Sequence, residues 1–257
     1  MELRNPLFKS MDKDTYEGTE AVCTIHGTFG KTLFLVLIAV AAAIGSIVLL
    51  NGIFGATSDA ELEQKLMTYV GLLIGSLVGV IIFGIIANLS TTLCPVFSVL
   101  FSVAMGFLLG SISGIADLAY PGIALIAIVL TLAVTLTMGI LYFTGVIKVG
   151  HKFKAFILTS LIGLVVGSAT LGILAACNVP GMRELLTSSP LGWFVDIFAA
   201  IIAALSLCVD FDYAAGLADR EADKKYEWKA AFCLSSSILY LYLRILYLLM
   251  RVAAAKK

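Results

Sequence analysis

A few charged side chains lie within long apolar stretches of this sequence, where charges are rare. Asp196, Asp210 and Asp212 fall in one stretch and Arg244 in the next, with Arg251 near the end of the latter. A charge at the bilayer centre costs at least about 2.5 to 3.5 kcal/mol on insertion scales, so such residues usually mark a functional site. A carboxylate in this setting can bind a proton or a cation, and an arginine can pair with it. The residue types therefore indicate ion or proton handling.

The spacing of these residues predicts how two neighbouring helices meet. Asp196 and Asp210 are fourteen residues apart and share one helical face, while Ser237 lies one heptad before Arg244 on a face of the next helix. From the expected depths we predict that Asp196 pairs with Arg244 and that Asp210 lies opposite Ser237. The alternative is that Asp196 and Arg244 snorkel or face separate polar pockets. Asp212 lies about 200° around the helix from Asp210, which indicates an interfacial position.

The elements that position these residues are predicted from composition. Of the 257 residues, 60% are hydrophobic and 13% are charged, and the mean hydropathy is +1.04. An ordinary soluble domain is only about 45–50% apolar, so the sequence predicts an all-α, polytopic membrane protein. Crossing a bilayer takes roughly 20 helical residues. Runs of that length occur seven times, at 32–54, 68–89, 95–116, 121–144, 154–177, 191–213 and 230–252.

The polar segments predict the domain organisation and the topology. Residues 1–30 form a polar amino-terminal segment without a secretory signal, and residues 31–257 form the membrane domain. Basic residues gather before the first span and after the fourth and sixth, which places the amino terminus in the cytoplasm. Their positions are Arg4, Lys9, Lys13, Lys31, Lys148, Lys152, Lys154, Arg220, Lys224, Lys225 and Lys229. The net charge of zero excludes a basic surface for nucleic acid.

Small residues predict close helix packing, because lipid offers no hydrophobic force between helices. Glycines recur every four residues in three spans, at Gly71, Gly75 and Gly79, at Gly106, Gly110 and Gly114, and at Gly163 and Gly167. Pro95 and Pro121 lie at span starts, where proline is tolerated as a first helical residue.

No catalytic motif is present in the sequence. We find no H-E-x-x-H, no G-x-S-x-G and no phosphate-binding glycine loop, so nothing supports an enzyme. Five cysteines without C-x-x-C spacing indicate structural thiols. No resident cofactor is expected.

Several short stretches of this sequence together resemble the Bax inhibitor-1-like (YccA-like) membrane proteins, in one bacterial branch of the family. The stretches occur in order over most of the chain. They are NPLF at 5–8, GTFGKT at 27–32, LGSIS at 109–113, YPGI at 120–123, LYFTGVIKV at 141–149, HKF at 151–153, SPLG at 189–192, VDFDY at 209–213, KYEWKAAF at 225–232 and LYLRILYLL at 241–249.

The resemblance implies a seven-transmembrane-helix bundle with the last helix near its centre, in the bacterial inner membrane. Some members are pH-sensitive calcium leak pathways, in which an aspartate on the sixth helix and one on the seventh share a proton or exchange it for a cation. Asp210 stands at the first of these positions and would be the metal-binding residue for Ca²⁺. Depending on the alignment, the second falls on Ser237 or Arg244, and the branch usually carries a glutamate where this chain has Met105.

Two functions are therefore expected as alternatives. One is a cation leak gated where the sixth and seventh spans meet, with Asp210, Asp212 and Ser237 sensing the ion or proton and Asp196 with Arg244 as a gating pair. The missing second carboxylate weighs against it. The other is a non-conducting regulator that binds a membrane-bound quality-control protease or another membrane partner, with the mixed-charge segment MDKDTYEGTEAV as the contact.

Overall fold

The described part of the chain is built from helices. The computed structural model describes residues 22–54, 58–176 and 190–255. Seven helices are found there, each on one of the predicted apolar runs, so the all-α prediction is confirmed. They are α2 (Ile25–Phe54), α3 (Asp59–Leu89), α4 (Cys94–Ala119), α5 (Ile123–Phe143), α6 (His151–Ala176), α8 (Pro190–Asp219) and α9 (Tyr226–Ala255).

Within the described residues, six helices are long and apolar enough to cross a membrane: α2, α3, α4, α5, α8 and α9. This confirms a polytopic membrane protein. Helix α6 has 26 residues and covers the fifth predicted span, and its crossing stays a prediction. Large apolar side chains are exposed on the outer faces of the bundle, as lipid contact requires. Examples are Leu37, Met67, Leu125, Leu136 and Phe194.

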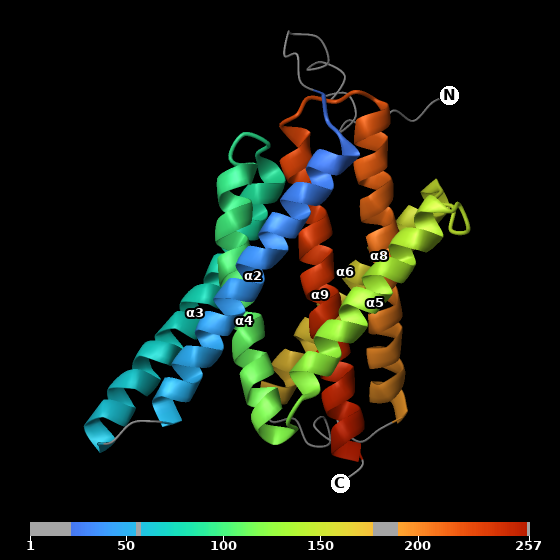
Figure 1. Ribbon diagram of the computed structural model, residues 1–257. Coiled ribbons are helices and arrows are strands. Elements are labelled where there is room, and N and C mark those ends of the chain that lie inside the picture. The colour runs from blue at the N-terminus through green and yellow to red at the C-terminus, as the bar shows by residue number, and fades with distance from the viewer. Residues whose placement is uncertain (1–21, 55–57, 177–189, 256–257) are drawn as a thin grey trace.

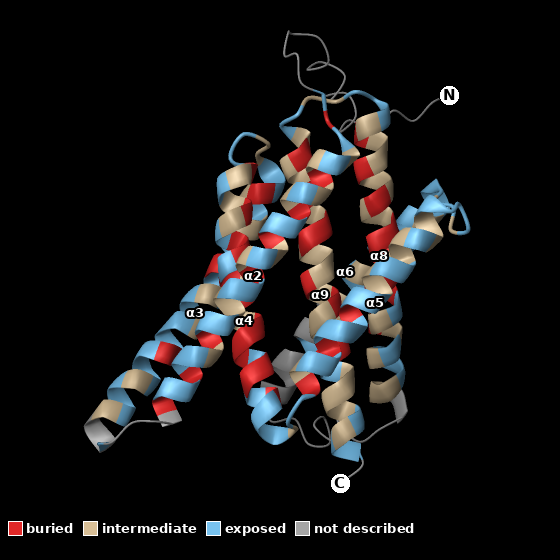
Figure 2. Ribbon diagram, in the orientation of Figure 1, coloured by how far each residue is buried: buried red, intermediate tan, exposed pale blue. Residues whose placement is uncertain are grey.

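Helix α9 lies in the middle of the bundle (Figure 1) and packs against α2, α3, α4, α5 and α8. Buried residues occur along α9 from Glu227 to Leu246 and on the facing sides of α4 and α8 (Figure 2). The central position that the resemblance implied for the last helix is confirmed. We call the end where α2 begins and α8 ends the upper end, and the end where α2 and α9 end the lower end. The two ends of α9 therefore lie at opposite ends of the bundle.

Two helices extend beyond their predicted spans at the upper end. Helix α8 continues to Asp219, six residues past the predicted end, and α9 begins at Tyr226, four residues before the predicted start. Small and polar residues can continue a helix outside the hydrocarbon, and hydropathy alone does not detect them. Asp210 consequently lies nine residues, or about 14 Å of helical rise, below the upper end of α8.

Small residues bring α2 and α4 together. A methyl group added at Gly106 would lie 2.7 Å from the Cα of Ala39, and one at Gly110 would lie 2.8 Å from the carbonyl carbon of Ala43. The packing prediction is confirmed for these glycines of α4, and for Gly114, which faces Leu50.

The same prediction is wrong for other glycines of the repeats. A methyl group at Gly71, Gly75, Gly163 or Gly167 would have no described neighbour within 4 Å. These four glycines lie on helix faces that no other described helix covers. Spacing alone does not say which face of a helix is buried, and therefore does not distinguish the two groups.

Candidate functional site

The candidate site is the contact between α8 and α9, which run in opposite directions. Asp210 on α8 lies beside Ser237 on α9, close enough for the serine hydroxyl to act on the carboxyl. The predicted packing of the two helices and the position of Asp210 opposite Ser237 are thus both observed. A carboxyl inside a bilayer needs such a partner, because lipid supplies none.

The Asp210 carboxyl carries an unsatisfied oxygen. Its Oδ2 atom is buried and has no hydrogen-bond partner among the described residues. The thiols of Cys208, on the same helix, and Cys233, on α9, are close enough to Asp210 to interact electrostatically with its carboxyl. Toward the lower end, the space between α8 and α9 is filled by apolar side chains, including Leu207, Leu241 and Ile245. Asp210 therefore lies at the top of an apolar core that continues between α8 and α9 toward the lower end.

A second polar contact lies at the lower end of this apolar core. Asp196 forms an ion pair with Arg251, and both side chains are largely buried, at 13% and 11% exposure. The guanidinium also lies over the Trp193 ring, 5.2 Å from its centroid. The ion pair compensates both charges near the end of the apolar stretch, and the Trp193 ring adds a favourable contact with the guanidinium.

The predicted pairing of Asp196 with Arg244 is wrong. Asp196 lies fourteen residues before Asp210, and Arg251 lies fourteen residues after Ser237, so two antiparallel helices of equal rise bring both pairs into contact. Arg244 lies only seven residues after Ser237, which leaves it about 10 Å short of Asp196.

Arg244 instead uses a partner on its own helix. Its Nε donates to the Tyr240 hydroxyl at 2.8 Å, and its guanidinium lies 4.9 Å from the centroid of the same ring. This arrangement differs from both alternatives predicted from the sequence. Tyr240, four residues before Arg244, supplies both the hydrogen-bond acceptor and the aromatic ring that the guanidinium contacts.

The revised pairing predicts energetic coupling between Asp196 and Arg251. In a double-mutant cycle with Asp196→Asn and Arg251→Gln, we expect an interaction energy of about 0.5–3 kcal/mol. The free energy of unfolding would be measured by denaturant titration in micelles. The matched cycle with Arg244→Gln is expected to be additive within about 0.5 kcal/mol. Coupling of Asp196 to Arg244 but not to Arg251 would contradict the pairing.

Asp212 points away from Asp210, as predicted. Its carboxylate forms an ion pair with Lys154 of α6 and accepts a hydrogen bond of 3.3 Å from the Tyr142 hydroxyl of α5. Its side chain is 26% exposed. Asp212 thus ties α5 and α6 to α8 at the side of the candidate site and does not contact Ser237.

Sequence analysis missed a buried carboxylate at the upper end, Glu227, which is 1% exposed. Its Oε1 accepts hydrogen bonds from the Thr24 backbone N–H at 2.8 Å and the Thr24 hydroxyl at 3.0 Å. Its Oε2 pairs with Lys31, whose ammonium lies 5.3 Å from the centroid of the Trp228 ring. A carboxylate at the start of α2 also interacts favourably with the helix dipole. Through these hydrogen bonds and this ion pair, Glu227 connects the first turns of α2 to the start of α9.

The segment before α2 is part of the same contact. Cys23 donates its backbone N–H to the Ala222 carbonyl at 2.7 Å, and Val22 forms an isolated bridge with Asp223. Burial raises the pKa of the Cys23 thiol, which keeps it uncharged beside the Glu227 carboxylate. One signal could have revealed Glu227: Lys31 directly precedes the apolar run of α2 and needs a counter-ion there.

The described residues contain no group of three or more His, Cys, Asp or Glu side chains that could hold a metal ion. Ca²⁺ takes six to eight oxygen ligands. Asp210 and Ser237 could supply two or three of them, so an ion at this place would keep most of its water.

The comparisons with known proteins agree with this architecture. The family model described as Bax inhibitor 1 like matches residues 5–254. A search of curated proteins and a search of solved structures each returned no match. Because the family model covers almost the whole chain, this membrane protein belongs to the Bax inhibitor 1 like family.

Proposed function

We propose that this protein is a pH-sensitive cation leak pathway, with Ca²⁺ as the ion, that is closed in the described conformation and controlled at Asp210. The supporting observation is the Asp210 carboxyl between α8 and α9, beside Ser237, with one buried oxygen that has no hydrogen-bond partner among the described residues. An ionised carboxyl in that place requires a cation or water, whereas a protonated one can bond to Ser237. Proton and cation therefore compete for one group, and that competition would bias the packing of α8 on α9.

Opening the pathway would require a change in the packing of α8 against α9 below Asp210. The apolar core below Asp210 blocks hydrated ions, and the Asp196–Arg251 pair ties the two helices together at the lower end. In this proposal Asp196 and Arg251 take the gating role that the sequence suggested for Asp196 and Arg244. Asp212 acts from the side through Lys154.

The proposal predicts that Asp210→Asn removes the pH dependence of calcium flux. The protein would be reconstituted in liposomes with a trapped calcium dye and compared at acidic and alkaline pH. We expect a flux in the wild type that changes with pH and falls at least tenfold in the variant, because an amide neither binds a proton nor attracts a cation. The control is Asp219→Asn, an exposed residue nine positions later on the same helix. An unchanged pH profile in Asp210→Asn would contradict the assignment.

A second candidate is the non-conducting membrane regulator. It is favoured by Ser237, which lies beside Asp210 and is one of the two positions, with Arg244, where the resemblance implied a second aspartate, so the site lacks a like-charge pair. Absence of calcium flux at every pH, together with specific recovery of a membrane-bound protease in pull-downs, would favour this function over the leak.

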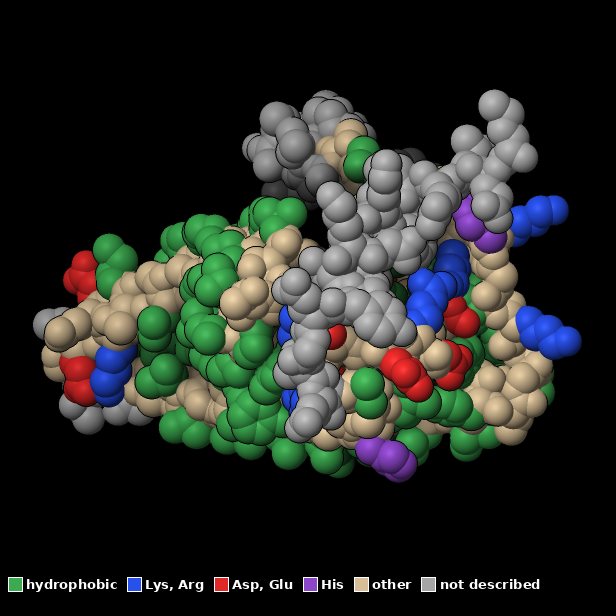
Figure 3. Space-filling model, turned by 90° about the horizontal axis from the view of Figure 1, so that it is seen from above, with side chains coloured by type: hydrophobic (Ala, Val, Ile, Leu, Met, Phe, Trp, Pro, Cys, Tyr) green, Lys and Arg blue, Asp and Glu red, His purple; other side chains and the backbone are tan. Residues whose placement is uncertain are grey.

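The proposed location is the bacterial inner membrane, with the upper end facing the cytoplasm. Basic side chains gather at that end when the molecule is seen from above (Figure 3). They include Lys31, the lysines around the start of α6 and those between α8 and α9. This asymmetry supports the cytoplasmic amino terminus by the positive-inside rule. Residues 1–21, which contain most of the amino-terminal contact segment, lie outside the described residues.

A further inference from the structure

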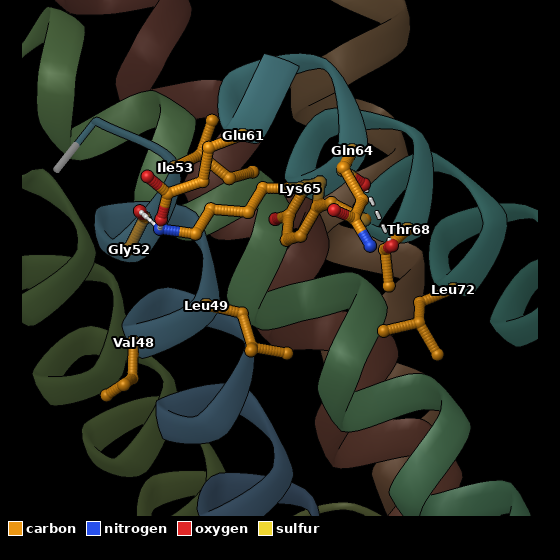
Figure 4. Close-up of a pocket in the computed structure, with 10 residues that line it drawn as sticks. Val48, Leu49, Gly52, Ile53, Glu61, Gln64, Lys65, Thr68 and Leu72 are labelled. Carbon is orange, nitrogen blue, oxygen red and sulfur yellow. Dashed lines mark hydrogen bonds and ion pairs between the residues drawn. The ribbon is translucent and has the colours of Figure 1, made fainter. Parts of the chain in front are cut away.

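A pocket lies between α2 and α3 at the lower end of the bundle, far from the α8–α9 contact (Figure 4). Its volume is about 460 Å³. Polar side chains form one edge and apolar side chains the other (Figure 4). The polar edge consists of Glu61, Gln64, Lys65 and Thr68, and the apolar wall includes Val48, Leu49 and Leu72.

The polar edge carries one cation and one anion side by side. Lys65 Nζ lies 2.6 Å from Glu61 Oε1 and donates to the Gly52 carbonyl at 3.2 Å. An ammonium has three N–H donors, so these two bonds leave a third for a ligand. Both side chains of the pair are well exposed, at 39% and 43%, and an exposed pair of this kind is weak and easily exchanged.

The polar edge and the apolar wall of the pocket lie at different depths along α3, which correspond to the headgroup layer and the hydrocarbon layer of a bilayer. Lys65 lies three residues, or about 4.5 Å of helical rise, before the apolar run at 68–89, while Leu72 lies inside that run and about 10 Å deeper than Lys65 along the helix. The headgroup layer adds roughly 5 to 8 Å on each side of the hydrocarbon. The charged edge is therefore at headgroup depth, and the apolar wall is at the depth of the acyl chains.

We propose that this pocket binds a phospholipid whose headgroup carries a phosphate and a primary ammonium, as in phosphatidylethanolamine. The phosphate would accept from Lys65, and the headgroup ammonium would donate to the Glu61 carboxylate in exchange for Lys65. One acyl chain would lie along Val48, Leu49 and Leu72. A phosphatidylglycerol headgroup would satisfy Lys65 with the same phosphate but has no ammonium to offset that charge beside Glu61, and a quaternary ammonium has no N–H to donate.

Native mass spectrometry of the delipidated full chain tests this assignment. The probes are dioleoyl phosphatidylethanolamine, the corresponding phosphatidylglycerol and phosphatidylcholine, and dioleoylglycerol, which lacks the phosphate. We expect phosphatidylethanolamine to be retained about tenfold more tightly than dioleoylglycerol. Lys65→Gln is expected to remove this preference, and Glu61→Gln to remove the preference over phosphatidylglycerol.

Two further variants locate the binding. Lys148→Gln, an exposed lysine at the opposite end, is the matched control and should retain the lipid as the wild type does. Leu49→Trp fills the apolar wall with both charges in place and should weaken retention about tenfold. Equal retention in the wild type, Lys65→Gln and Leu49→Trp, or equal retention of all four lipids, would overturn the proposal.

Discussion

Replacing Glu227 with alanine is expected to destabilise the protein by about 3–5 kcal/mol, the usual effect of breaking a buried ion pair from one side. The substitution leaves the Lys31 ammonium without its anion and the first turn of α2 without the acceptor of the Thr24 N–H. The free energy of unfolding in micelles is the appropriate measurement. A loss of less than about 1 kcal/mol would mean that water replaces the carboxylate and that the contact does not fasten α2 to α9.

A matched control exists at the other end of the molecule. Glu61 also pairs with a lysine, but its side chain is 43% exposed, so Glu61→Ala is expected to change stability by only about 0.5 kcal/mol. The double variant Glu227→Gln with Lys31→Met should recover part of the loss, because it removes both charges and leaves no isolated ion. Failure of the double variant to exceed Glu227→Gln alone in stability would contradict the pairing.

Adding a single methyl group at Gly106 is expected to lower stability by about 1–3 kcal/mol, the usual effect of overpacking. The added carbon of Gly106→Ala would meet the backbone of Ala39, which cannot rotate away as a side chain can. Helices α2 and α4 would have to separate along their contact. The measurement is again the free energy of unfolding, together with the yield of folded protein from membranes.

The control for this variant has the opposite expected sign. Gly75→Ala places the same methyl group where nothing lies within 4 Å, so the higher helix propensity of alanine should leave stability unchanged or raise it by up to about 1 kcal/mol. Equal effects at Gly106 and Gly75 would show that propensity, and not contact between α2 and α4, determines the result.

The number and order of the helices were predictable, because a run of about 20 apolar residues has few alternatives to a membrane-spanning helix. Pro95 marked the first turn of α4 as expected. The helix ends were less predictable, since α8 and α9 continue into polar residues that hydropathy does not register.

The candidate site was predictable where helical spacing alone decides it. Asp212 lies on another face than Asp210, because angles around one helix follow from sequence spacing. Asp210 and Ser237 meet as expected from their depths along the two spans. The partner of Asp196 was not predictable, since choosing between Arg244 and Arg251 requires the relative shift of two helices along their axes.

The sequence by itself determined that this is a helical membrane protein with acidic residues on its sixth predicted span, because hydropathy and the 3.6-residue period are properties of each segment alone. Only the tertiary structure decided which charges compensate one another. It joined Glu227 to Lys31 and Asp196 to Arg251, and it separated glycines that pack from glycines that do not. These contacts depend on the register and rotation of each helix against its neighbours, which are set by packing across the whole bundle.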